Sequence, residues 1–147
     1  MTARKIGNLE LPPLDQVGFV VRNVEATMAV YEPLFGPFTV METELVDADY
    51  RGRKASCKLK IATGYSGTVE IELIEMVDGE GVYGEFLDAG REGPHHIRFR
   101  IDNLDEAVGE AAKEGFSPIF SKRFSPEVAF AYVEAADGML FEFLEMP

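Results

Sequence analysis

The first half of the chain has a hydrophobic pattern that changes from the period of a strand to that of a helix and back. In residues 14–22, every second residue from Val17 to Val21 is apolar, which predicts a strand with one apolar face. Apolar residues then recur three or four positions apart from Val24 to Phe35, and a glycine follows, which predicts a helix. Asparagine before this segment can cap the helix. Three more strands are predicted near residues 38–46, 56–63 and 68–76.

The second half of the chain repeats this plan. Shifted by 80 positions, the apolar residues of 15–24 fall on those of 95–104. Shifted by 70, residues 69–76 fall on residues 139–146. Two matches in the same order indicate an internal duplication. The second copy predicts a strand at 95–101, a helix capped by Asn103 that ends before Gly115, and strands near 117–122, 127–134 and 139–145.

The repeated order predicts an α+β fold. We expect two tandem βαβββ modules that form a curved mixed sheet with a cleft, the first at residues 14–76 and the second at 94–146. Residues 82–89 are expected to form a short helix that links the modules. A chain of 147 residues has the size of one domain, so residues 1–147 are interpreted as a single domain.

Composition restricts the classes of partner. The chain has 14 Lys and Arg against 26 Asp and Glu, a net charge of −12, and this sign argues against binding to nucleic acid or to an anionic membrane. The one cysteine, Cys57, allows no internal disulfide, which is typical of a cytoplasmic protein, and no secretory signal is evident. We therefore expect a cytoplasmic protein.

Four polar residues occupy strand positions that are expected to face the interior. Gln16 and His96 are equivalent under the first shift, and Glu72 and Glu142 are equivalent under the second. Glu142 lies in a strand that is otherwise almost entirely apolar. A buried carboxylate is costly unless it is paired or bound to a metal.

A pseudo-two-fold axis between the copies would bring these four residues together. Three oxygen donors and one imidazole suit a divalent ion such as Zn, Ni, Co, Mn or Mg, with positions left for water or substrate. Simpler interpretations stay open: His96 as a hydrogen-bonded core histidine, Glu72 as half of a surface ion pair, and Gln16 as a residue that only holds a water.

Three stretches of the chain resemble the vicinal oxygen chelate superfamily, which includes glyoxalases, methylmalonyl-CoA epimerase, bleomycin-resistance proteins and extradiol dioxygenases. The opening of the family is similar to the stretch LDQVGFVVRNVEATMAVYEPLFGPF. The start of its second module is similar to GPHHIRFRIDNLDEA, and the end of that module is similar to DGMLFEFLE. The resemblance covers about residues 14–146 and is strongest to the epimerase and glyoxalase-like branch.

The resemblance implies a ligand set and an acid/base pair. Each module of the family supplies one metal ligand from its first strand and one from its last, which here are Gln16, His96, Glu72 and Glu142. Many relatives have histidine where this chain has Gln16, and the set found here resembles that of some glyoxalases. The two-histidine set of extradiol dioxygenases is disfavoured, because only one suitable histidine is present. The second acid/base carboxylate of the epimerases aligns with Lys58, which departs from the family pattern.

The activity that the resemblance implies is metal-dependent proton transfer next to a carbonyl, through an enolate, on a small acyl thioester or a related compound. This describes an epimerase or isomerase, or a glyoxalase-like lyase. We expect Glu142 to be the base and Lys58 the second proton carrier. A lactoylglutathione lyase and a metal-free small-molecule binding or resistance protein of the same fold are the alternatives. Family analogy also implies a homodimer.

Basic residues at two places could contact an anionic substrate. Arg98 shares a strand face with His96 and is expected either to anchor a carboxylate or phosphate or to form an internal salt bridge with Glu70 or Glu72. Residues 51–60 hold five of the fourteen basic residues. They either steer an anionic substrate or line the solvated edge of a hairpin.

Overall fold

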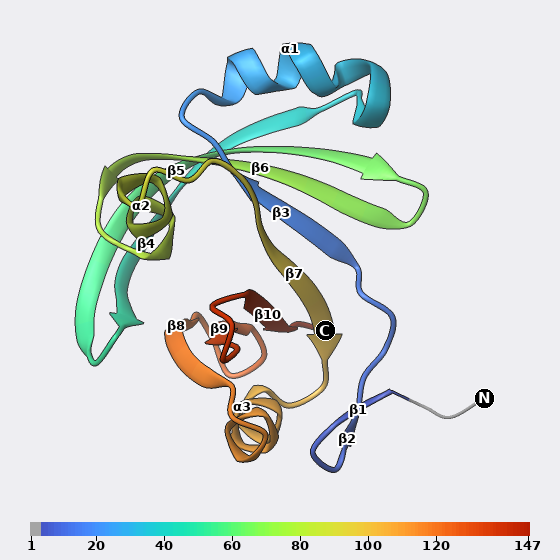
Figure 1. Cartoon of the computed structure of the whole chain (residues 1–147), viewed down its shortest axis with the longest axis vertical. Helices are drawn as coiled ribbons and strands as arrows, with labels where there is room; N and C mark the ends of the chain where they lie inside the picture. Colours follow the sequence, from blue (N-terminus) through green and yellow to red (C-terminus); the bar gives the residue numbers. More distant parts are fainter. Residues whose placement is uncertain (1–3) are drawn as a thin grey trace.

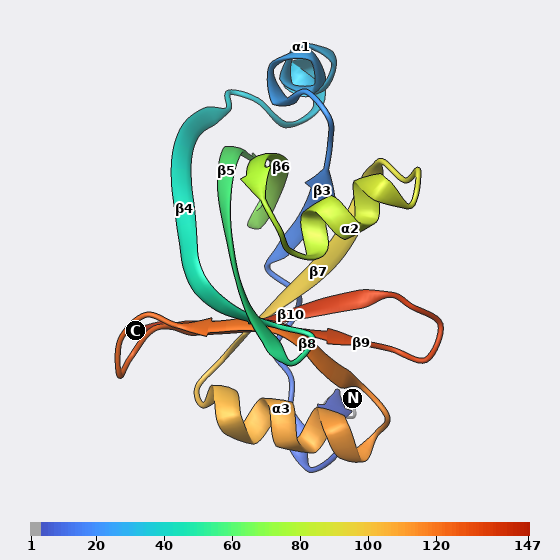
Figure 2. The ribbon, with the colours of Figure 1, turned by 90° about the vertical axis from the view of Figure 1, so that its left-hand side faces the viewer.

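Both predicted βαβββ copies are present in the structure, a computed structural model that describes residues 4–147 (Figure 1 and Figure 2). The first copy consists of β3 (Gln16–Val20), α1 (Val24–Phe35), β4 (Thr39–Tyr50), β5 (Arg53–Ser66) and β6 (Val69–Gly79). The second consists of β7 (Gly93–Ile101), α3 (Leu104–Lys113), β8 (Ser117–Arg123), β9 (Ala129–Glu134) and β10 (Leu140–Glu145). The linking helix α2 spans Val82–Asp88, as predicted.

Two features of the strands differ from the prediction. β4 and β5 continue to the turn between Tyr50 and Arg53, because small or apolar residues still alternate with charged ones there. A hairpin of β1 (Lys5–Ile6) and β2 (Leu9–Glu10) precedes the first copy. Its strands are two residues long, too short to produce a detectable period.

The eight longer strands form one curved mixed sheet that closes on itself. The strand order is β10-β7-β3-β6-β5-β4-β8-β9, with parallel β3–β6 and β7–β10 pairs and antiparallel pairs elsewhere. The two copies meet at the antiparallel β3–β7 pair, and Figure 1 shows α1 and α3 at opposite ends of the molecule. On the far side, β4 and β8 pair over only two residues. The curved mixed sheet of the predicted fold class is therefore confirmed.

The helices α1 and α3 cover the outer face of the sheet. The predicted stripe of α1 packs against β5 and β6, with Val24 buried and Met28, Tyr31 and Phe35 partly buried. Asn23 accepts a hydrogen bond from the Ala26 backbone N–H, which confirms the predicted cap. Asn103 caps α3 in the same way. No helix among residues 4–147 is long and apolar enough to cross a membrane.

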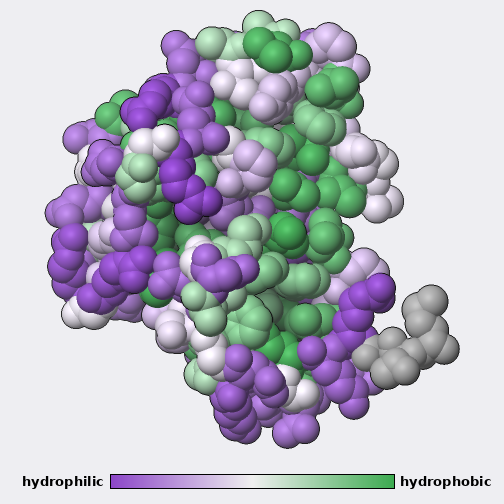
Figure 3. Space-filling view, viewed as in Figure 1, coloured by the Kyte–Doolittle hydropathy of each residue, from purple (hydrophilic) through white to green (hydrophobic). Residues whose placement is uncertain are grey.

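Helix α1 also exposes large apolar side chains on its solvent side. Figure 3 shows hydrophobic residues at the surface at the α1 end of the molecule, and Val30 and Leu34 there are 69% and 67% exposed. The homodimer implied by the family resemblance stays a prediction.

The basic segment 51–60 does not lie at the edge of the sheet. The interpretation of these residues as the solvated edge of a hairpin is therefore wrong. β5 pairs with β4 on one side and with β6 on the other, which leaves it no free edge. Four of its five basic side chains instead form ion pairs with acids close by, namely Arg51–Glu85, Arg53–Glu80, Lys54–Asp49 and Lys60–Glu25.

The inner face of the sheet is filled mainly by aromatic side chains. Phe120, Phe130 and Tyr132 from the second copy pack there against Tyr83 and Phe86 from α2. This core borders the inward-facing polar residues of β3, β6, β7 and β10.

Candidate metal centre

The structure brings the four predicted ligands together around one atom, Nε2 of His96. This nitrogen lies 3.1 Å from Gln16 Oε1, 3.3 Å from Glu142 Oε1 and 3.5 Å from Glu72 Oε1. Each side chain comes from a different strand, and the four strands are neighbours in the order β10-β7-β3-β6. The convergence expected from the duplication is therefore present.

The strand register explains this arrangement. Gly18 faces His96 across the antiparallel β3–β7 pair, and Glu72 faces Gly18 across β3–β6. Glu142 reaches the cluster from β10, on the other side of β7. Because β6 and β10 flank the central β3–β7 pair, the two carboxylates approach His96 from opposite sides.

Gly18 provides the space that the His96 ring occupies. A Cβ atom at Gly18 would lie 2.1 Å from Cε1, 2.3 Å from Nε2 and 2.7 Å from Nδ1 of His96. Any side chain there would collide with the imidazole. This role was not predicted from the sequence, although the alignment of the two copies already places Gly18 against a large residue, Arg98.

The cluster is buried and carries opposite charges. Gln16 and His96 are each 1% exposed, Glu142 is 8% exposed, and the Glu72 side chain is 16% exposed. Burial lowers the pKa of His96, but hydrogen bonds to Glu142 and Glu72 outweigh this effect and raise the pKa to about 9. Two buried carboxylates around one nitrogen thus require a positive charge between them, which a protonated imidazole or a bound cation supplies.

Glu70 fixes the orientation of the Gln16 amide. Gln16 Nε2 donates to Glu70 Oε1 at 2.6 Å, which leaves Gln16 Oε1 facing His96. An amide oxygen, an imidazole nitrogen and two carboxylates are donor types that fit a divalent ion. Their spacing here is that of a hydrogen-bonded cluster: among residues 4–147, no three or more His, Cys, Asp or Glu side chains are arranged as a ready metal site.

Arg98 lies beside the cluster and is held by an internal ion pair. Its guanidinium donates to both carboxylate oxygens of Asp15, at 2.9 and 3.2 Å, and lies 3.8 Å from Glu70. The sequence left a salt bridge to Glu70 or Glu72 open, but did not predict Asp15 as the main partner. Since Glu70 also accepts from Gln16, a chain of contacts joins Arg98 to the cluster.

Lys58 is not brought to the cluster. It faces Glu44 on β4 and Asp78 on β6, and its side chain is exposed on the outer face of the sheet. The neighbouring inward positions of β5 are Cys57 and Leu59, which belong to the apolar core. We therefore leave Lys58 out of the mechanism proposed below.

Two tyrosines adjoin the cluster on the inner face. The hydroxyl groups of Tyr83 and Tyr132 lie 2.9 Å apart, and the Tyr132 ring packs edge-on against His96. Burial and the nearby Glu142 charge raise the pKa of both phenols well above its ordinary value. Both therefore stay protonated, and because one hydroxyl donates to the other, one phenol O–H remains to donate elsewhere.

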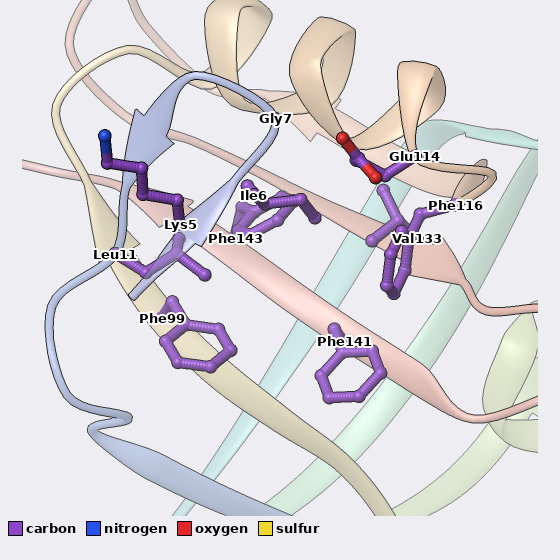
Figure 4. A pocket seen from close by; sticks show the side chains of 10 residues that line it. All are labelled: Lys5, Ile6, Gly7, Leu11, Phe99, Glu114, Phe116, Val133, Phe141 and Phe143. Atoms are coloured by element: carbon purple, nitrogen blue, oxygen red, sulfur yellow. The ribbon is translucent and has the colours of Figure 1, made fainter. Parts of the chain in front are cut away.

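An apolar cavity of about 380 Å³ lies away from this centre. Figure 4 shows it between the β1–β2 hairpin, α3 and the outer face of the sheet, with the rings of Phe99, Phe116, Phe141 and Phe143 among its walls. Phe141 and Phe143 flank Glu142 along β10 and so point to the opposite face. The cavity thus does not adjoin the polar cluster.

The fold agrees with the comparisons to known proteins. The chain belongs to the glyoxalase/bleomycin resistance protein/dioxygenase superfamily, whose family model matches residues 15–132. It is 25% identical over 136 residues to the uncharacterized protein YqjC of Bacillus subtilis, covering 90% of this chain and 91% of that protein.

Solved structures share the fold. The methylmalonyl-CoA epimerase from Mycobacterium tuberculosis aligns over 100% of this chain and 93% of its own, with 20% identity and a TM-score of 0.67. The hypothetical protein BH1468 from Bacillus halodurans C-125 aligns over 91% and 94%, with 23% identity and a TM-score of 0.65. A methylmalonyl-CoA epimerase in complex with methylmalonyl-CoA and ammonium aligns over 94% and 100%, with 19% identity and a TM-score of 0.63.

Proposed function

We propose that this protein is a metal-dependent enzyme that moves a proton at a carbon next to a carbonyl group. The observation that carries the proposal is the convergence of Gln16, Glu72 and Glu142 on the Nε2 atom of His96. The fold shared with methylmalonyl-CoA epimerases supports a small acyl thioester as the substrate class. A bound divalent ion would polarise the carbonyl oxygen as a Lewis acid and stabilise the negative charge that develops on it.

The proton itself is handled by the two carboxylates. Glu142 takes the proton from the carbon next to the carbonyl. The electron pair of the broken C–H bond forms a carbon–carbon double bond, and the π pair of the C=O bond moves onto the carbonyl oxygen. Glu72 approaches from the other side, through β6, and in its protonated form would donate its proton to the opposite face of the same carbon as the C=O bond forms again. The proton held by Glu142 is then lost to solvent, and Glu72 takes up a new one. This gives the inverted configuration, and Glu72 takes the part that the sequence had assigned to Lys58. The aromatic core beside the cluster excludes water from the reacting carbon.

Exchange of the substrate α-proton tests the role of Glu142. With methylmalonyl-CoA in deuterated water and each of Zn²⁺, Ni²⁺, Co²⁺, Mn²⁺ and Mg²⁺, the wild-type protein is expected to incorporate deuterium, measured by mass spectrometry. Glu142→Gln should abolish the exchange, because an amide cannot accept the proton. The matched control is Glu145→Gln, since Glu145 lies on the same strand but contacts Arg123 and the Leu104 backbone N–H. Exchange at the wild-type rate in Glu142→Gln would refute the base assignment.

A lactoylglutathione lyase stays the alternative within the enzymes, because the same cluster can act on an enediolate. Methylglyoxal with glutathione, followed by absorbance, separates the two activities. Turnover of this mixture without exchange of methylmalonyl-CoA would assign the protein to the lyases.

One observation favours a metal-free binding protein as the second candidate. The carboxylate oxygens of Glu72 and Glu142 lie against His96. Within residues 4–147, no three or more His, Cys, Asp or Glu side chains are spaced so that they could hold a metal ion as they stand. Metal analysis of purified protein, followed by titration with the same five ions, distinguishes the candidates. Absence of any bound or titratable ion would favour sequestration of a small molecule.

A further inference from the structure

A β-bulge places His95 on the same side of the sheet as His96. In the β3–β7 pair, Gly18 faces His96 but Phe19 faces Pro94, so His95 is the extra residue between two paired positions. Alternation along a regular strand would have pointed His95 outward. Both histidines are buried instead, with exposures of 3% and 1%.

The bulge brings the two imidazoles into direct contact. His95 Nδ1 lies 2.9 Å from His96 Nδ1. The Nε2 atom of His96, on the far side of its ring, is the atom that faces Gln16, Glu72 and Glu142. A neutral imidazole has one N–H donor and one acceptor nitrogen, so one proton is shared between the two Nδ1 atoms.

We propose that His95 is a positioning residue that accepts a hydrogen bond from His96 Nδ1–H and thereby keeps His96 Nε2 free to bind a divalent cation. The inference rests on the proposed metal centre. If the proton were donated in the other direction, neutral His96 would carry its proton on Nε2 and could not bind a cation through that atom. When one ring nitrogen of a histidine binds a metal, a hydrogen bond made by the other ring nitrogen fixes the tautomer and the orientation of the ring.

The surroundings of His95 hold its ring in place. It packs edge-on against Phe86, with ring centroids 4.9 Å apart, and contacts Tyr83 and Tyr132 at 5.7 and 6.0 Å. Its Nε2 atom has no hydrogen-bond partner among the described residues, and the residue borders a cavity of about 120 Å³ beside α2. Among residues 4–147, the His95 side chain therefore makes one hydrogen bond to another side chain, and its partner is His96.

The test compares two substitutions by metal affinity. His95→Leu removes the acceptor, whereas His95→Asn places an oxygen at the δ1 position and can still accept from His96. Titration calorimetry with Co²⁺ is expected to show a dissociation constant about 10–100-fold higher for His95→Leu. His95→Asn should recover most of this loss. Near-ultraviolet circular dichroism and urea unfolding check that both variants are folded.

A spectroscopic signature distinguishes positioning from general packing. In the Co²⁺-loaded wild-type protein, the Nδ1–H proton of His96 should give a strongly shifted proton resonance that exchanges slowly with water. It should be broadened by exchange in His95→Leu and retained in His95→Asn. An unchanged resonance and an unchanged dissociation constant in His95→Leu would overturn the proposal.

Nitrogen NMR of the metal-free wild-type protein at a pH above 9, where His96 is neutral and has one ring proton, keeps the inference separate from the proposed function. Binding of no Co²⁺ by the wild-type protein would refute the metal centre. The ¹⁵N shifts of the two histidines would still report which Nδ1 atom carries the shared proton. A proton on His96 Nδ1 supports the inference, and a proton donated from His95 Nδ1 to a bare His96 Nδ1 contradicts it.

Discussion

Replacing Gly18 by alanine tests whether the cluster depends on space made by the first strand. The new Cβ atom would lie 2.1–2.7 Å from three atoms of the His96 ring, where ordinary contacts between such atoms begin near 3.4 Å. The imidazole must therefore move by about 1 Å or more. It has little room to do so, because His96 is 1% exposed and its Nδ1 atom contacts His95.

The expected cost follows from two opposing effects. Overpacking of a filled interior costs about 1–3 kcal/mol, and alanine in a strand recovers about 0.5–1 kcal/mol relative to glycine. We expect a net loss of about 1–2 kcal/mol in the free energy of unfolding. Because Nε2 is displaced with the ring, divalent metal affinity should fall as well.

Urea unfolding and calorimetric metal titration measure both effects. Gly109→Ala is the matched control, because Gly109 lies in α3 and has open space around its Cβ position. This change should stabilise the protein by up to about 1 kcal/mol through helix propensity and leave metal affinity unchanged. A Gly18→Ala variant with wild-type stability and wild-type metal affinity would show that the cluster does not depend on the space at Gly18.

Two further predictions concern groups outside the ligand set. Arg98→Gln should lower the free energy of unfolding by about 1–3 kcal/mol, because it leaves the partly buried Asp15 carboxylate without its ion pair and removes the nearby cation from Glu70, which keeps its hydrogen bond from Gln16. Arg53→Gln, which breaks an exposed pair with Glu80, should cost less than about 1 kcal/mol in the same assay, and equal losses would contradict the difference in burial. Burial raises the pKa of the Cys57 thiol to about 11, so native protein at pH 8 should resist Ellman's reagent and react fully once unfolded in urea. The stability that the neutral thiol contributes is present below pH 9 and is lost as the pH rises through about 11. Rapid labelling of the native protein at pH 8 would contradict the prediction, because it would show that Cys57 is accessible.

The sequence predicted those parts of the site that follow from periodicity and duplication. Gln16 and His96, and likewise Glu72 and Glu142, occupy equivalent positions in two copies of one pattern, and a pseudo-two-fold axis brings equivalent positions to one point. The inward side of a regular strand also follows from alternation. These rules were sufficient to identify the cluster and the order of the elements.

The remaining features depend on strand register, which alternation does not determine. Gly18 lies under the His96 ring because of the β3–β7 register, and His95 turns inward because of a bulge in the same pair. A shift of one residue reverses the face of a side chain, so regular alternation from the inward-facing His96 would have placed His95 on the outer face. Lys58 was placed by alignment to a family position, whereas the pairing of β5 puts it on the outer face.

A crystal structure of the protein grown with Zn²⁺, with an anomalous difference map at the zinc edge, shows whether Gln16, Glu72, His96 and Glu142 hold one metal ion. A metal centre formed by the four side chains predicts one strong peak at about 2.0–2.2 Å from Gln16 Oε1, His96 Nε2 and one oxygen each of Glu72 and Glu142. No peak at this position, with the three oxygens still resting against the His96 ring at saturating zinc, would contradict it.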